Sequence, residues 1–120
     1  MKLSVAALTF DCADASKLAD FWSRVLGVPV DPDASDGFAS IGQSASPPLD
    51  PGWMFIQVPE GKTAKNRFHI DLASQNWSAD VEAVVALGAT RIGEYDESGA
   101  RWVSLADPEG NEFDIVAGGH

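Results

Sequence analysis

The chain has 120 residues, of which 45% are hydrophobic and 22% are charged, as in an ordinary globular protein. Its 18 Asp and Glu residues outnumber its 8 Lys and Arg residues, which gives a net charge of −10. A surface of this sign repels phosphate backbones and anionic lipids, so we expect neither nucleic acid nor a membrane as a partner.

Cys12 is the single cysteine, which excludes an intrachain disulfide and a cluster of thiolate ligands. No apolar run approaches the roughly 20 residues that a membrane-spanning helix needs. Met1–Ser4 leads into a strand pattern without the apolar core of a signal peptide. We therefore expect a protein of the reducing cytoplasm.

The first half of the chain predicts a strand, a helix and further strands. Residues Leu3–Asp11 alternate loosely and are rich in strand-forming types. Asp14 is suited to cap the helix that follows, and Gly27 is suited to end it. The helix has one apolar stripe at helical spacing, formed by Leu18, Phe21, Trp22, Val25 and Leu26.

Shorter elements follow this helix. Residues Val30–Gln43 predict one or two short strands with a turn at Asp36–Gly37. The segment Ser44–Gly52 holds three prolines and predicts a surface loop, because proline has no amide donor for a sheet. Trp53–Val58 predicts the next strand, with Trp53, Phe55 and Gln57 on one of its faces.

The second half repeats this order. Phe68, Ile70 and Leu72 alternate with polar residues, which predicts a strand with His69 and Asp71 together on its other face. A helix is expected over Ser78–Leu87, and strands near Thr90–Tyr95, Arg101–Leu105 and Glu112–Val116. The run Asp107–Asn111 before the last strand is typical of a tight turn.

The two halves match each other in detail. Val25-Leu26-Gly27 corresponds to Ala86-Leu87-Gly88 at an offset of 61 residues, and the opening strands correspond at an offset of 62. The sequence therefore predicts an α+β fold in which the order strand, helix, strands occurs twice, over approximately residues 1–61 and 62–120, within a single domain.

This chain resembles the glyoxalase / bleomycin-resistance / extradiol-dioxygenase group, the vicinal oxygen chelate superfamily. The resemblance covers essentially all 120 residues and is strongest in four segments: Leu18–Gly27, Arg67–Leu72, Leu87–Ala89 and Asp107–Phe113. It implies an α+β fold of two βαβββ modules, whose curved mixed sheets enclose a cleft, and a homodimer. Because one scaffold hosts many activities, it implies much less about chemistry.

Metal-dependent members of that group place ligands on the first and last strand of each module. The resemblance puts those four positions at Ala7, Gln57, His69 and Asp114. Ala7 cannot bind a metal and Gln57 offers only a neutral oxygen. The implied site for Zn, Ni, Mn or Fe therefore has few strong ligands. Asp71 or Glu112 could lend an oxygen. The alternative is a metal-free cleft in which His69 and Asp114 form an ion pair.

Aromatic residues suggest a ligand surface. Trp53 and Phe55 share a face with Gln57, and Trp102 lies on a strand of the second half, where either it or Val103 faces inward. Aromatic walls with nearby acidic groups suit a flat or cationic organic molecule.

Two functions are compatible with these residues. One is a metal-dependent lyase, isomerase or dioxygenase in which Asp114 is the catalytic base. The other is a metal-free protein that binds and sequesters a small molecule, as bleomycin-resistance proteins do.

Overall fold

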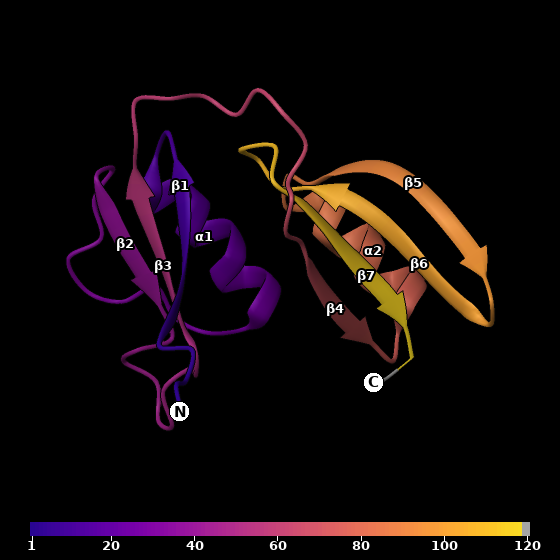
Figure 1. Cartoon of the computed structure of the whole chain (residues 1–120), viewed down its shortest axis with the longest axis horizontal. Helices are drawn as coiled ribbons and strands as arrows, with labels where there is room; N and C mark the ends of the chain where they lie inside the picture. The colour runs from indigo at the N-terminus through magenta and orange to yellow at the C-terminus, as the bar shows by residue number, and fades with distance from the viewer. Residues whose placement is uncertain (119–120) are drawn as a thin grey trace. The chain divides into compact units, whose positions relative to one another are not determined.

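The computed structural model describes residues 1–118, which form two compact units over residues 1–61 and 62–118. The first unit contains β1 (Ala7–Cys12), α1 (Ala15–Leu26), β2 (Phe38–Ile41) and β3 (Gly52–Gln57). The second contains β4 (Ile70–Ser74), α2 (Trp77–Ala86), β5 (Thr90–Glu97), β6 (Ala100–Ala106) and β7 (Glu112–Ala117). The chain order is labelled in Figure 1.

Each unit has a mixed sheet in which its first strand runs parallel to its last. The three-stranded sheet has the order β1-β3-β2, and the four-stranded sheet has the order β4-β7-β6-β5. β1 pairs in parallel with β3, and β4 pairs in parallel with β7. The predicted α+β fold is confirmed. In the first unit, however, the first strand after α1 is reduced to an isolated bridge between Val30 and Ile41.

Helix α1 begins and ends where the sequence predicts. The Asp14 side chain accepts a hydrogen bond from the Lys17 amide, and Gly27 ends the helix in the left-handed conformation at φ 69°. A residue with a side chain is disfavoured in that conformation, which explains the glycine. Among the residues that the structure describes, neither helix is long and apolar enough to cross a membrane.

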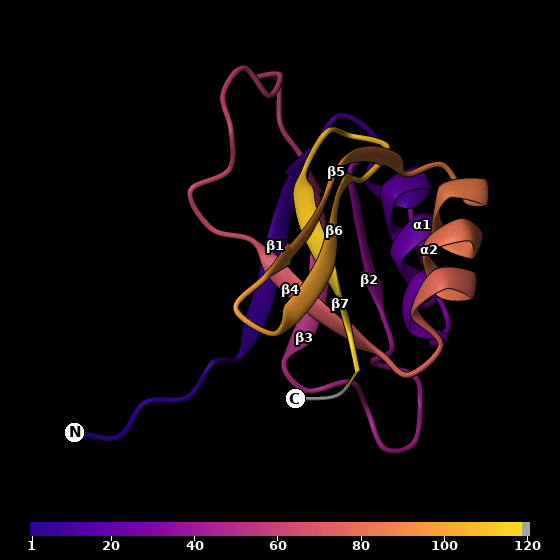
Figure 2. The same ribbon diagram turned by 90° about the vertical axis from the view of Figure 1, so that its right-hand side faces the viewer.

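One helix covers one face of each sheet, as Figure 2 shows within each unit. In the first unit the core is aromatic, since Phe10 contacts Trp22, Trp53 and Phe55 at ring distances of 5.1–5.7 Å. In the second unit it is mainly aliphatic and includes the buried residues Val81, Val84, Val103, Leu105, Phe113 and Ile115. The opposite side of each sheet is called its helix-free face below.

β1 starts later than predicted. The expected strand over Leu3–Asp11 forms only from Ala7, because its partner β3 begins at Gly52. Pro51, the residue before Gly52, has no amide proton to extend the pairing. Met1, Leu3 and Val5 are therefore left exposed.

Candidate metal and ligand site

The helix-free face of the second sheet gathers the polar residues of the candidate site. Phe113 and Ile115 of β7 are buried on the helix side, so Asp114 between them points to the other face. Asp71 lies directly opposite Asp114 on the parallel strand β4. His69, two residues before Asp71, has its imidazole on this same face.

The imidazole lies between the two carboxylates. His69 Nε2 is 3.1 Å from Asp71 Oδ1 and 3.4 Å from Asp114 Oδ2. One ligand atom from each of these three residues lies within 4.8 Å of the other two. We call His69, Asp71 and Asp114 the triad.

The triad has a donor set and spacing that fit a divalent ion. Two ligands about 2.1 Å from one ion and separated by about 90–110° lie about 3.0–3.4 Å apart, close to both distances from His69. Two carboxylates and one imidazole also supply two negative charges, which match the charge of the ion. Without a cation, two carboxylates on directly opposite residues repel each other.

The two carboxylates of the triad differ in burial. The Asp114 side chain is 17% exposed, whereas the Asp71 side chain is 50% exposed. Asp114 Oδ1 accepts a 2.6 Å hydrogen bond from the Ser104 hydroxyl, which leaves Oδ2 towards His69. Ser104 lies opposite Asp114 in the antiparallel pairing of β6 with β7.

An aromatic pair lies on the same face. Trp102 is two residues from Ser104 on β6, and it stacks on Tyr95 of β5 with a ring distance of 5.3 Å and an angle of 21°. Val103 is buried on the helix side. The orientation that the sequence left open is thus resolved, with Trp102 on the helix-free face.

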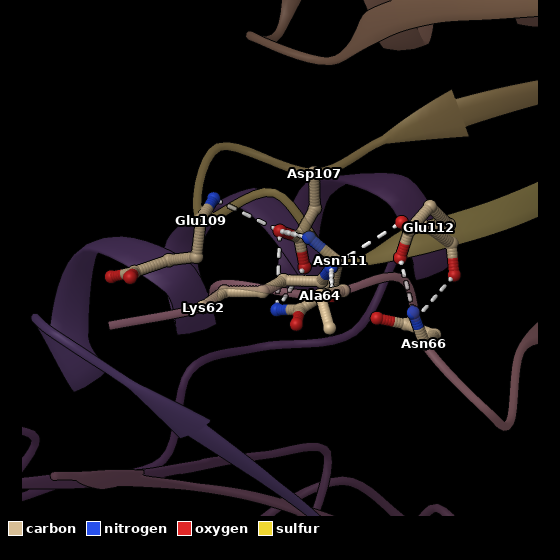
Figure 3. A network of polar contacts seen from close by, with 7 residues as sticks. All are labelled: Lys62, Ala64, Asn66, Asp107, Glu109, Asn111 and Glu112. Atoms are coloured by element: carbon tan, nitrogen blue, oxygen red, sulfur yellow. Dashed lines mark hydrogen bonds and ion pairs between the residues drawn. The ribbon is translucent and has the colours of Figure 1, made fainter. Parts of the chain in front are cut away.

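Glu112 belongs to a second polar cluster at the start of β7, shown in Figure 3. Its carboxylate pairs with Lys62 at 3.3 Å and accepts the Asn66 amide at 3.1 Å. Burial acts to raise the pKa of Glu112, but the hydrogen bond from Asn66, its own backbone and Lys62 outweigh burial and lower it. Glu112 thus holds the segment that leads to His69 rather than adding a fourth ligand to the triad.

Residues predicted in the first unit do not form a comparable group. Trp53 and Phe55 are 6% and 0% exposed in the core beside Phe10, so the expectation that they line a ligand cleft is not met. The pattern of alternation was correct, but the face that they share is the one covered by α1.

Gln57 lies on the helix side as well. Its side-chain amide donates a 2.9 Å hydrogen bond to the Ala13 carbonyl. Ala7 pairs with Gly52 in the parallel register, so Ala7 and Gln57 point to opposite faces of the first sheet. The register of β1 with β3 therefore shows that the placement of Ala7 and Gln57 at one metal site is wrong.

The sequence pointed to His69, Asp114 and Trp102 but missed Ser104 and Tyr95 as parts of the face. Asp71 was recognised only as a residue that could lend an oxygen. The signal for Ser104 is its position opposite Asp114, which requires the register of β6 with β7. That register depends on the length of the turn between them.

Comparisons with known proteins agree with this fold. A family model described as "Glyoxalase-like domain" matches residues 7–116. A glyoxalase/bleomycin resistance protein/dioxygenase family enzyme from Burkholderia phytofirmans PsJN is similar at TM-score 0.75 and 18% identity, covering 96% of this chain and 98% of that one. No curated protein is similar enough in sequence to count as a match.

Two further solved structures are similar in fold. The fosfomycin resistance protein FosX from Listeria monocytogenes, a mutant in complex with Mn(II) and 1S,2S-dihydroxypropylphosphonic acid, has TM-score 0.77 and 15% identity, with coverage of 99% and 93%. The bleomycin-binding protein from Streptomyces verticillus, in complex with copper(II)-bleomycin, has TM-score 0.64 and 18% identity, with coverage of 99% and 99%. With the family model matching most of its length, this chain belongs to the glyoxalase-like domain family.

Proposed function

We propose that this protein binds a divalent metal ion through His69, Asp71 and Asp114 and uses it to hold a small organic molecule by its oxygen atoms. The observation that carries the proposal is the position of His69 Nε2, 3.1 Å from one carboxylate and 3.4 Å from another. The three donors all come from the second unit. The proposed site therefore needs no ligand from Ala7 or Gln57.

The chemistry follows from the exposure of the site. An ion held there would supply a Lewis acid that polarises an oxygen of the bound molecule. The imidazole and the Asp71 side chain are 47% and 50% exposed, so solvent or a ligand can reach the donors. Asp114 is the residue that we propose as proton acceptor, since a carboxylate that binds the ion would also lie next to the oxygen atoms of the bound molecule. The reaction classes to assay are lyase or isomerase chemistry and dioxygenation.

The Tyr95–Trp102 pair supports a flat organic ligand. Trp102 lies opposite Val116, two residues from Asp114. Diagonal neighbours on adjacent strands are about 7–8 Å apart, a distance that a small ring with oxygen substituents can span. Trp102 is therefore proposed as a ligand-binding residue, in contact with the ring of a molecule whose oxygens reach the ion.

The test of metal binding is elemental analysis and calorimetry at neutral pH with zinc, nickel, manganese, iron(II) and cobalt. We expect about one ion per chain, with affinity reduced at least about 100-fold in His69→Ala. Asp96→Asn is the control. It removes a negative charge from the second unit, but Asp96 pairs with Arg101 and is not part of the triad. Equal affinity in His69→Ala and wild type would refute the site.

A second function rests on the aromatic pair alone. A metal-free protein could bind a flat or cationic molecule against Tyr95 and Trp102 and sequester it without reaction. Quenching of tryptophan fluorescence by such compounds in metal-free protein, lost in Trp102→Ala, would favour this function. A strict requirement for the ion would favour the first.

We also propose a homodimer. β1 and β4 are edge strands of their sheets, and the exposed residues Met1, Leu3 and Val5 precede β1. Exposed edges and apolar residues of this kind are commonly covered by a partner. Light scattering coupled to size-exclusion chromatography should give twice the mass of one 12.7 kDa chain. A cytoplasmic location stays a prediction from the sequence.

A further inference from the structure

We propose that Ser104 is a positioning residue that fixes Asp114 as a ligand using one oxygen. This inference rests on the proposed metal site and adds to it a residue outside the triad. It identifies which carboxylate is held rigidly and which is free to adjust.

The contact is set by the sheet. Ser104 and Asp114 are paired residues on antiparallel strands, both on the helix-free face. Side chains of such a pair leave the backbone about 4.5–5.5 Å apart, so they meet without any long-range arrangement. The 2.6 Å distance from Ser104 Oγ to Asp114 Oδ1 is that of a hydrogen bond from a hydroxyl to a carboxylate.

The hydrogen bond assigns different roles to the oxygens of Asp114. Oδ1 accepts the Ser104 proton, and Oδ2 lies 3.4 Å from His69 Nε2, where the ligand atoms converge. Rotation of the carboxylate towards a bidentate arrangement would break the bond from Ser104. Asp114 is therefore held with a single oxygen available to the ion.

Among the residues that the structure describes, none gives Asp71 comparable support. The structure gives its Oδ1 a contact with His69, and its side chain is 50% exposed, compared with 17% for Asp114. One fixed carboxylate and one adjustable carboxylate allow the site to accept ions of different size. Ser104 is the source of that asymmetry.

The experiment compares metal affinity by calorimetry in wild type, Ser104→Ala and Ser104→Thr, using Mn(II) and Zn(II) without any organic ligand. Loss of a hydrogen bond that orients a ligand typically lowers metal affinity by about 10–100-fold, which we expect for Ser104→Ala. Ser104→Thr keeps the hydroxyl and should remain close to wild type. Circular dichroism checks that each variant is folded.

A double-mutant comparison separates positioning from a general effect on the fold. If Ser104 acts through Asp114, then Ser104→Ala should change the residual affinity of Asp114→Ala protein by less than about 2-fold, a sign of strong coupling. Ser78→Ala, which removes a hydroxyl from α2, should leave affinity unchanged. An equal loss in both backgrounds would show that Ser104 does not act through Asp114.

The outcomes for this inference and for the proposed function are distinct. Failure of wild-type protein to bind any of the ions overturns the metal site and the role of Ser104 with it. If wild type binds the ion and Ser104→Ala binds it with the same affinity, only the role of Ser104 is overturned. Loss of affinity in both Ser104→Ala and Ser104→Thr would contradict the role assigned to the hydroxyl, because threonine retains this group.

Discussion

The two units share an order of elements but differ in what their helix-free faces present. By the parallel registers and the offset of the opening strands, the triad residues His69, Asp71 and Asp114 correspond to Ala7, Thr9 and Met54. None of these three can supply a charged ligand. The comparison teaches that repetition of the backbone does not repeat the site, since chemistry is placed by a few side chains on one face.

The two units also differ in where their aromatic side chains lie. The first unit packs aromatic rings around its sheet and helix, among them Phe10, Trp22, Trp53 and Phe55. The second has two of its aromatic side chains, Tyr95 and Trp102, stacked on the helix-free face instead. Buried rings stabilise the core of the first unit, whereas the Tyr95–Trp102 pair of the second unit lies on the helix-free face, outside the core.

The largest expected effect tests this difference between the cores. Trp22→Ala removes a fully buried ring that contacts Phe10, Phe21 and Trp53, and it should lower the free energy of unfolding by about 3–5 kcal/mol. Trp102→Ala, the matched change on the helix-free face, should cost less than about 1.5 kcal/mol. Urea denaturation measures both, and equal losses would remove the distinction.

A medium effect tests the buried carboxylate of the first unit. Asp31 is 8% exposed and accepts hydrogen bonds from Ser40 Oγ, Ser44 Oγ and the amides of Gln43 and Ser44. Asp31→Asn leaves one oxygen in place of two and should lower the free energy of unfolding by about 2 kcal/mol at pH 7.

The pH dependence of that loss has a definite sign. Burial acts to raise the pKa of Asp31, but the hydrogen bonds from Ser40, Ser44 and Gln43 outweigh burial and lower it. The folded state therefore releases this proton more readily, so the stabilisation is complete above the unfolded value of about 3.9 and fades as the pH falls through the folded pKa. Denaturation at pH 7 and pH 3 should show the gap between Asp31→Asn and wild type narrowing. A constant gap would contradict this account.

The smallest effect tests Glu112, the carboxylate of the second unit that is held by hydrogen bonds in the way Asp31 is held in the first. Glu112→Gln weakens the pair with Lys62 and the bond from the Asn66 amide, and it should cost about 1 kcal/mol. The pKa of Glu112 is also lowered, so its contribution should fade at acid pH as well. Raising the salt concentration should reduce the difference between Glu112→Gln and wild type, because the Lys62 pair is partly exposed.

Local signals in the sequence predicted the elements well. Asp14 and Gly27 fix the ends of α1 through bonds to neighbouring residues, so no knowledge of the rest of the chain is needed. The start of β1 was wrong because a strand also needs a partner, and the partner begins at Gly52 after a proline. Helix ends are local, and strand ends are not.

The candidate site was predictable only where residues lie close in sequence. His69 and Asp71 share a strand face by alternation, and this relation is confirmed by their contact. Trp53 and Phe55 also share a face, but alternation does not tell which side of the sheet a helix covers. The sequence predicts a cleft for them, whereas they lie in the core. The partnership of Ser104 with Asp114 depends on the register between two strands and could not be read from spacing.

The position of β4 has a consequence for motion. β4 is an edge strand with β7 as its only neighbour in the sheet of the described chain. Asp71 lies near its beginning, and His69 directly precedes the strand. Amide protons at such an edge exchange readily with solvent, because few bonds must open to expose them. An ion shared by Asp71 and Asp114 would join the two strands through their side chains. Hydrogen exchange at the start of β4 should then slow when the ion is added, while exchange in β1 stays as it was.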